Sequence, residues 1–138
     1  MNEETMRKPS ITRRMWATNL NTENKLEIIS LELSGMLSSE LKMAGMLVLE
    51  EVYTNVKKYG YEKEDQEAYL FVFLVKEEDS NVLAFLDYGK EFDPTSFVLE
   101  EPDCKQVGGH GIRLVREFSK EMKYRRTADG ANVLEIVL

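Results

Sequence analysis

The sequence lacks the features that mark secreted and membrane proteins. It contains one cysteine, Cys104, which cannot form an internal disulfide and fits a reducing cytosol. Its longest apolar runs, LFVFLV and VLAFL, are too short to span a bilayer. Residues 1–10 carry mixed charge without an apolar core, so we expect no signal peptide. These absences predict a cytoplasmic chain that does not enter a membrane.

An excess of positive charge is also missing. The formal net charge is −7, whereas binding to a phosphate backbone requires a positive footprint. The basic clusters ITRR and KYRR are too small to reverse this balance. We therefore expect no direct contact with nucleic acid.

What is present indicates one globular domain. The 138 residues are 43% hydrophobic and 31% charged, which is enough to build a core without general disorder. We expect a tail over residues 1–10 and a domain over residues 11–138. The expected elements are a strand at 11–20, helices at 21–37 and 38–60, a hairpin of strands at 68–76 and 81–89, a long loop at 90–111, a helix at 112–122 and a closing hairpin at 123–138.

Several residues set the expected boundaries and the expected core. The first strand offers Ile11, Trp16 and Leu20 as inward anchors. The two long helices carry apolar side chains at helical spacing, namely Leu26, Ile29, Leu33 and Leu37 in the first and Leu41, Gly45, Val48, Val52 and Val56 in the second. The pattern predicts an α+β fold in which about three helices cover one face of a mixed sheet.

Cap-type residues predict where the two long helices begin and end. Asn21 or Thr22 can cap the first helix, and Ser38 or Ser39 can cap the second. Gly60 is a plausible stop for the second helix.

Asp87 is the first residue that points to chemistry, because it ends the buried run VLAFL. Burying a carboxylate costs several kcal/mol unless hydrogen bonds or a ligand satisfy it. An ionised carboxylate only accepts hydrogen bonds, so it can select the amine of adenine and reject the carbonyl of guanine. Gly89 would let the backbone approach another molecule closely. Alternatively, Asp87 simply caps the following turn.

The segment GGHGIRLV is the second candidate. Gly108, Gly109 and Gly111 precede a helix, whose free amides and dipole attract an anion. The alternative is an ordinary turn, because the lysine of a P-loop is missing. His110 lies in the same loop, where it either faces solvent or contacts phosphate.

Glu51 and Asn55 form the third candidate. A spacing of four residues places both side chains on one helix face, beside the core-facing stripe. The oxygen of an Asn side chain suits Mg²⁺, and a nearby carboxylate can accept a proton from an attacking hydroxyl. The alternative is a solvated Glu beside an Asn that bonds back to its own helix.

Together these motifs resemble those of the anti-sigma-factor serine/threonine kinases, a single-domain branch of the ATPase superfamily that includes gyrase and histidine kinases. The family motif E-x-x-x-N followed by H-G or H-A is similar to Glu51, Asn55 and the pair Tyr59–Gly60. The motif D-x-G-x-G-F-D-P is similar to DYGKEFDP, and G-G-x-G-x-x-L-V to GGHGIRLV. The resemblance runs from about residue 11 to the end of the chain.

The resemblance implies the two-layer α/β sandwich of the Bergerat fold, with a mixed, mostly antiparallel sheet. It also implies ATP and Mg²⁺ as cofactors. Asn55 would hold Mg²⁺, Asp87 would read the adenine amine and Gly89 would approach the base. Glu51 would be the general base that activates a serine hydroxyl.

The glycine segment would then bind phosphate. Gly108, Gly109, His110 and Gly111 would lie against the phosphates, with residues 95–108 as a lid. The partners implied are a STAS-type anti-sigma antagonist as substrate, a sigma factor, and a second copy of the chain. The expected homodimer interface is the N-terminal strand with the first helix.

The sequence departs from the family motifs at three positions. Glu91 replaces a glycine, Tyr59 replaces a histidine, and His110 stands where an apolar residue is common. Glu91 supports an alternative function, a nucleotide-gated binding module without useful kinase activity. A third interpretation, a non-nucleotide interaction domain, requires all three motifs to be accidental.

Overall fold

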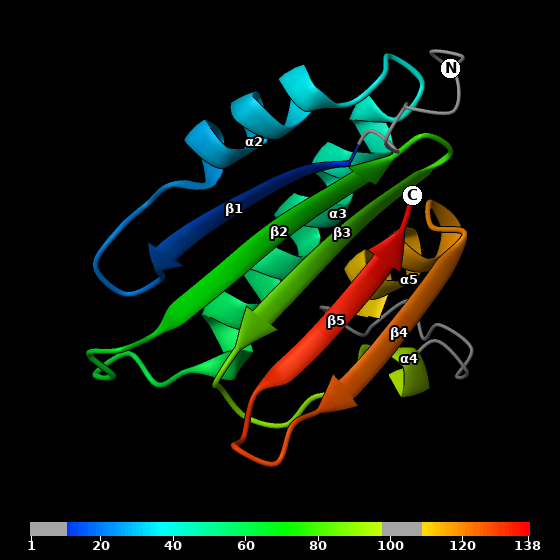
Figure 1. Cartoon of the computed structure of the whole chain (residues 1–138). Coiled ribbons are helices and arrows are strands. Elements are labelled where there is room, and N and C mark those ends of the chain that lie inside the picture. The colour runs from blue at the N-terminus through cyan, green and yellow to red at the C-terminus, as the bar shows by residue number, and fades with distance from the viewer. Residues whose placement is uncertain (1–10, 98–108) are drawn as a thin grey trace, which may run out of the picture.

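The computed structural model describes residues 11–97 and 109–138. Its strands form one five-stranded sheet in the order β1-β2-β3-β5-β4, and every neighbouring pair is antiparallel (Figure 1). The strands are β1 (Thr12–Asn19), β2 (Tyr69–Glu77), β3 (Ser80–Asp87), β4 (Glu121–Arg126) and β5 (Asn132–Val137).

The helices form the second layer. They are α2 (Leu26–Met36), α3 (Lys42–Asn55), the π-helical turn η1 (Val56–Gly60), the short α4 (Pro94–Phe97) and α5 (Gly109–Glu117). The three longer helices, α2, α3 and α5, lie on the same face of the sheet (Figure 1). The predicted α+β sandwich with about three helices on one face is therefore confirmed. None of the helices in the described ranges is long and apolar enough to cross a membrane.

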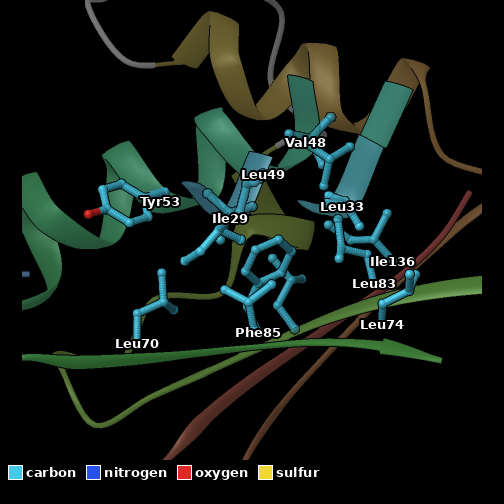
Figure 2. Packing of buried hydrophobic residues seen from close by; sticks show 14 of the residues in the cluster. Ile29, Leu33, Val48, Leu49, Tyr53, Leu70, Leu74, Leu83, Phe85 and Ile136 are labelled. Carbon is cyan, nitrogen blue, oxygen red and sulfur yellow. The ribbon is translucent and has the colours of Figure 1, made fainter. Parts of the chain in front are cut away.

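The core fills the space between these two layers. Figure 2 shows Ile29, Leu33 and Val48 of the helices pointing toward Leu74 and Leu83 of the sheet. The predicted helix stripes are confirmed, because their members are either buried or packed against this cluster.

Two of the three predicted anchors of the first strand are confirmed. Trp16 and Leu20 are buried, at 6% and 1% exposure. The third anchor, Ile11, is 45% exposed, so that prediction was wrong. Ile11 precedes the first paired residue, Thr12, and therefore lies outside the sheet.

The predicted cap of the first helix was wrong. The helix begins after Lys25, and neither Asn21 nor Thr22 caps it. Instead, the Asn21 amide donates to Asn19 Oδ1 at 3.1 Å, and the Asn19 amide donates to Glu23 Oε1 at 2.9 Å. These bonds form a turn, because short polar side chains compete for backbone groups outside helices.

The predicted cap of the second helix was wrong as well. α3 begins after Leu41 without a side-chain cap. The Ser38 carbonyl accepts amide hydrogen bonds from Leu41 and Lys42, at 3.0 and 3.1 Å, so the serine forms a preceding turn. The predicted stop is confirmed, because helical structure ends at Gly60 after the π-helical turn.

The last helix is shorter than predicted and begins earlier. α5 starts at Gly109, so Gly109 and Gly111 lie within the helix and not before it as predicted. α5 ends at Glu117 and not at residue 122, and Met122 belongs to β4. The Lys120 amide donates to the Val137 carbonyl at 2.7 Å, which draws this segment onto β5. Pairing with a neighbouring strand therefore overrides the helical pattern here. Both predicted hairpins, β2–β3 and β4–β5, are present.

Candidate functional site

A cavity of about 70 Å³ lies between α3 with η1 and the ends of β3 and β5. Apolar side chains form most of its wall, among them Val52, Val56, Phe85 and Leu134. The polar residues on the wall are Asn55, Asp87, Lys90 and Asn132. Such a mixture of apolar and polar residues is typical of ligand sites, although ligand pockets usually have volumes of about 300 Å³ or more. The cavity is therefore much smaller than a typical ligand site, so most of a ligand bound there would extend outside it.

Asp87 lines this cavity. It is the last residue of β3, and strand alternation turns its side chain inward, where it is 7% exposed. Its Oδ1 accepts hydrogen bonds from the Gly89 amide and from Asn132 Nδ2, both at 2.9 Å. Burial raises the pKa of Asp87, while these two bonds and the charge of Arg126 act against that rise. No donor among the described residues bonds Oδ2, so this oxygen remains available to a ligand.

Gly89 brings the loop after β3 against the end of η1. A Cβ atom at Gly89 would lie 2.4 Å from the Gly60 carbonyl oxygen, a distance that backbone atoms cannot tolerate. The Lys90 amide donates to this same oxygen at 2.9 Å. Gly89 therefore allows a close backbone approach to Gly60 within the chain, while its predicted approach to a bound base stays a prediction.

Sequence reasoning missed Asn132, the residue that connects this part of the site. Its Nδ2 donates to Asp87 Oδ1 and also to the carbonyls of Gly89 and Lys90, at 3.3 and 2.9 Å. Its Oδ1 accepts from the Tyr124 hydroxyl at 2.5 Å and from Arg126 Nη1 at 3.0 Å. Asn132 follows the turn of the last hairpin, where an Asn is commonly a turn residue. The sequence does not show that the Asn132 side chain points inward toward Asp87.

A half-buried group, the Tyr61 hydroxyl, fixes the backbone next to Asp87. The Tyr61 hydroxyl donates to the Tyr69 carbonyl at 2.6 Å and accepts from the Tyr88 amide at 2.7 Å. Burial, followed by weaker effects of neighbouring groups, raises the pKa of Tyr61 to about 12. The hydroxyl therefore stays protonated and holds residue 88 in place over the whole physiological pH range.

Asn55 and Glu51 lie on α3, one helical turn apart, as predicted. Asn55 lines the cavity, and its buried Nδ2 has no hydrogen-bond partner among the described residues. Rotation of the amide exchanges Nδ2 with Oδ1, so the same position can offer either a donor or an acceptor. The π-helical turn begins directly after Asn55, and such turns are frequent at functional sites.

Glu51 contacts the first turn of α5. A Cβ atom at Gly111 would lie 1.9 Å from Glu51 Oε2, so the glycine leaves room for the carboxylate. The structure thus brings Glu51 and Gly111 together. Gly109 and His110 belong to the first turn of α5, whereas Gly108 and most of the predicted lid lie outside the described residues.

Glu91, the residue that departs from the second motif, is exposed. Burial and then the charge of Glu91 raise the pKa of Tyr124. Its neighbour Lys90 pairs with Glu62 at 3.0 Å on the surface. Glu91 therefore lies on the solvent side of this loop.

Residues 24–138 match the histidine kinase-like ATPase domain. The chain belongs to this family. Its fold is similar to that of a chain in the crystal structure of the SiaB–SiaC complex from Pseudomonas aeruginosa, with a TM-score of 0.61 and 15% identity, covering 99% of this chain and 94% of the other. The search of curated proteins found no match.

Membership in the histidine kinase-like ATPase family implies that the domain binds ATP. Its residues fit that ligand in kind, because the buried carboxylate of Asp87 lines a mainly apolar cavity, as a group that accepts the amine of a base would. The fit for Mg²⁺ is partial. Asn55 offers one oxygen ligand, but no cluster of three metal-binding side chains occurs in the part of the chain that the structure describes. Mg²⁺ would therefore depend on phosphate oxygens for its other ligands.

Proposed function

We propose that this chain is an ATP- and Mg²⁺-dependent protein serine/threonine kinase of the anti-sigma type, carried by one domain over residues 11–138. Its pocket has two ends. The base end consists of Asp87, Gly89 and Asn132, and the phosphate end consists of Glu51, Asn55 and the start of α5. One observation carries the proposal: the buried carboxylate of Asp87 keeps one oxygen available inside an apolar cavity.

At the base end, Asp87 Oδ2 would accept a hydrogen bond from the amine of adenine. Asn132 and the Gly89 amide occupy Oδ1, so the carboxylate cannot rotate without losing two bonds. An acceptor-only group disfavours guanine, which presents a carbonyl oxygen at this position. Phe85, Val52 and Leu134 would pack against the ring.

At the phosphate end, Asn55 would hold Mg²⁺, which neutralises phosphate charge when bound. Glu51 would take the proton of a serine hydroxyl on a partner protein. The serine oxygen then forms a bond to the γ-phosphorus, the bond between that phosphorus and the bridging oxygen breaks, and ADP leaves. Positioning and charge stabilisation supply most of the catalysis in such transfers, so a compact site suffices. The amides of Gly109, His110 and Gly111, together with Gly108, would contact the phosphates.

The proposed partners are a STAS-type anti-sigma antagonist as substrate and a sigma factor as the captured protein. A chain of similar fold occurs in a complex of two different proteins, SiaB and SiaC, which supports a protein partner here. The homodimer implied by the sequence resemblance is also part of the proposal.

A second candidate function is a nucleotide-gated binding module without kinase activity. The position of Glu51 favours it, because its carboxylate packs on Gly111 and a phosphate at this helix start would meet that negative charge. In this function the nucleotide displaces Glu51 and changes the adjoining surface, and no phosphoryl group is transferred.

Calorimetric titration with ATP and GTP, each with and without Mg²⁺, tests the nucleotide site. We expect ATP to bind, GTP to be refused, and Asp87→Asn to lose about 10- to 100-fold in ATP affinity, as is typical for loss of a hydrogen bond to a charged group. Equal binding of ATP and GTP would contradict the assigned role of Asp87.

Glu51→Gln separates the two candidate functions. If the chain is a kinase, transfer of labelled γ-phosphate to the STAS-type partner collapses in this variant while ATP affinity is retained. If the wild-type chain binds ATP and transfers nothing, the binding module is the correct function.

A further inference from the structure

Arg126, the last residue of β4, reaches across β5 to the loop that follows β3. The strand register pairs Arg126 with Asn132 and Asn132 with Asp87, so the three residues form one row across the sheet. Arg126 Nη1 donates to Asn132 Oδ1 and to the Gly89 carbonyl, both at 3.0 Å. One guanidinium therefore contacts both groups that hold Asp87, although Arg126 lies outside the three sequence motifs.

Arg126 fixes the orientation of the Asn132 amide. A guanidinium donates hydrogen bonds and cannot accept them, so the amide atom that faces Arg126 must be the oxygen, Oδ1. The Tyr124 hydroxyl also donates to Oδ1, at 2.5 Å, but a hydroxyl can turn and accept if the amide flips. Arg126 is therefore the group that excludes the flipped amide. With Oδ1 held in this way, Nδ2 donates to Asp87 Oδ1 at 2.9 Å.

The orientation of this amide decides which form of Asp87 is favoured. In the structure a donor faces the carboxylate, and a donor stabilises the charged form. A flipped amide would instead bring its oxygen against Asp87 Oδ1, and that contact becomes favourable only when the carboxyl takes up a proton. A neutral carboxyl is a weaker hydrogen-bond acceptor than a carboxylate. Arg126 therefore helps to keep Asp87 a strong acceptor.

The charge of Arg126 acts in the same direction as its hydrogen bonds. Burial raises the pKa of Asp87, whereas two hydrogen bonds, followed by the positive charge of Arg126, lower it. The neighbouring elements add uncharged or titratable side chains, namely Leu70 of β2, Asn55 of α3, Tyr59 of η1, Tyr61, Lys90 and Tyr124. Lys90 already pairs with Glu62 at 3.0 Å on the surface. Arg126 is thus the cation whose charge reaches Asp87.

We propose that Arg126 is a positioning residue of the base end. It holds the Asn132 amide and the Gly89 carbonyl in place, so that the carboxylate of Asp87 meets the base as a charged acceptor. This inference rests on the proposed nucleotide site. Arg126 is not among the residues that line the cavity, so it acts through its neighbours and does not touch the base. Because its side chain is exposed, solvent moderates its charge.

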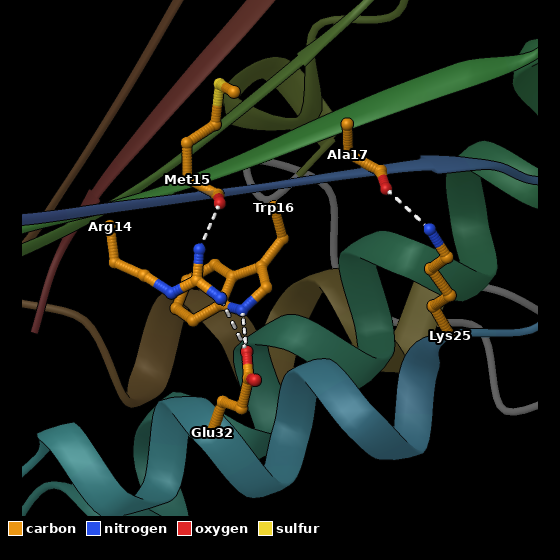
Figure 3. A network of polar contacts seen from close by, with 6 residues as sticks. All are labelled: Arg14, Met15, Trp16, Ala17, Lys25 and Glu32. Carbon is orange, nitrogen blue, oxygen red and sulfur yellow. Dashed lines mark hydrogen bonds and ion pairs between the residues drawn. The ribbon is translucent and has the colours of Figure 1, made fainter.

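Two other arginines serve as matched controls. Arg125 adjoins Arg126 on β4 and is exposed as well, but strand alternation turns it to the opposite face of the sheet, where it lies 3.9 Å from Glu135. Arg14, on the opposite edge strand β1, also donates two hydrogen bonds, one of them to Glu32 of α2 at 3.0 Å (Figure 3). Arg125 therefore controls for a nearby charge, and Arg14 controls for an arginine that ties two elements together.

The first experiment measures the pKa of Asp87 by carbon-13 NMR titration of the full chain without nucleotide, and Asp87→Asn identifies its carboxyl signal. We expect a higher pKa in Arg126→Met, which has neither the charge nor the donor. Arg126→Lys should stay near wild type, because lysine keeps the charge and also only donates. Arg125→Met and Arg14→Met should stay near wild type too.

The same spectra show whether each variant folds, and Arg126→Gln takes the place of Arg126→Met if the latter does not. An unchanged pKa of Asp87 in Arg126→Met would overturn the proposal. An equal rise in Arg125→Met or Arg14→Met would overturn it as well, because the effect would then not be specific to Arg126.

The second experiment links Arg126 to nucleotide binding, by calorimetric titration with ATP and Mg²⁺ over a range of pH. At neutral pH we expect Arg126→Met to bind ATP about three- to tenfold more weakly than wild type, as is typical for loss of one or two hydrogen bonds. The deficit should grow as pH falls, because Asp87 takes up its proton at a higher pH in this variant. Arg126→Lys should restore most of the affinity, and both control variants should stay within about twofold of wild type. Titration of the ATP phosphates is common to all variants and cancels in the comparison at each pH.

The two experiments separate this inference from the proposed function. If the wild type did not bind ATP, the nucleotide site would be wrong, while the NMR titration would still decide whether Arg126 controls the protonation of Asp87. If the wild type bound ATP but Arg126→Met kept full affinity at every pH, the nucleotide site would stand and the positioning role would be wrong. Lower stability of Arg126→Met without either change would mean that Arg126 is only structural.

Discussion

The two ends of the pocket differ in how completely the chain itself holds them. At the base end, Asp87, Gly89 and Asn132 are joined by hydrogen bonds to each other and to the backbone of neighbouring segments. At the phosphate end, Asn55 Nδ2 has no partner among the described residues, and Glu51 rests against Gly111. The proposed base end is thus held by bonds within the chain, whereas the proposed phosphate end leaves one buried polar atom without a partner among the described residues.

Gly89→Ala should have the largest effect, because it tests whether the base end is rigid. The new Cβ would lie 2.4 Å from the Gly60 carbonyl oxygen, and neither backbone segment can move without breaking the Lys90–Gly60 hydrogen bond. We expect a loss of about 3 kcal/mol in the free energy of unfolding, at the upper end for overpacking. Urea denaturation measures this loss, and ATP affinity should fall with it.

Gly35→Ala is the matched control for that substitution. Gly35 lies in α2, and a Cβ atom added there would have no other heavy atom within 4 Å. Alanine there should stabilise the chain by about 0.5–1 kcal/mol through helix propensity. If Gly89→Ala were as stable as wild type, the backbone at Gly89 and Gly60 would be able to move apart at little energetic cost, and the base end would not be rigid.

Asn132→Ala should have the next largest effect. It removes the donor to Asp87 Oδ1 and leaves the Tyr124 hydroxyl and Arg126 without their shared acceptor. Unsatisfied polar groups in such a place cost about 2 kcal/mol in the free energy of unfolding. The variant should also bind ATP more weakly, since Asp87 loses the bond that orients it. Unchanged stability in urea denaturation would show that Asn132 does not connect the base end.

Asp87→Asn should change stability in the opposite direction to function. Burial raises the pKa of Asp87 above its ordinary value of 3.8. Between pH 3.8 and the raised pKa, the folded chain therefore holds more protons than the unfolded chain. Stability therefore falls as pH rises through this interval, and at neutral pH the chain bears the full cost of a buried charge. The Asn side chain removes that cost while it can still accept the Gly89 and Asn132 bonds.

We therefore expect Asp87→Asn to be more stable than wild type at neutral pH, although it binds ATP poorly. Its advantage should shrink as pH falls through the raised pKa toward 3.8, where the wild-type carboxyl is neutral too. Denaturation curves of both proteins over this range test the sign. A variant that is less stable at neutral pH would mean that the hydrogen bonds to the carboxylate outweigh its burial.

The difference between local patterns and contacts between distant segments explains which features the sequence predicted and which it did not. Periodicity correctly predicted the helix stripes and both hairpins, because burial on one face imposes the spacing of apolar residues. The helix starts at Asn21 or Thr22 and at Ser38 or Ser39 were wrong, because both segments form local turns before the helices begin. The Asn21 side chain also donates to the carbonyls of Glu62 and Asp65, which lie close to it only in the folded chain.

The candidate site shows the same division. Glu51, Asn55 and Asp87 were recognisable from motif spacing within single segments. Asn132 was not, because its role depends on the register that places β5 beside β3, with Asn132 opposite Asp87. Contacts between segments distant in sequence leave no local pattern, so the polar network around Asp87 became visible only with the fold.

Gly111→Ala should have the smallest effect on stability, and it completes the comparison with Gly89. Its Cβ would overlap Glu51 Oε2 at 1.9 Å, but this atom is the far end of a flexible side chain that can swing aside. Alanine also favours a helix by about 0.5–1 kcal/mol, so the net change should stay within about 0.5 kcal/mol. ATP affinity should remain within about twofold of wild type, while phosphoryl transfer falls because Glu51 is displaced. If this substitution destabilised the chain as much as Gly89→Ala, the phosphate end would be as rigid as the base end, and nucleotide binding could not be what completes it.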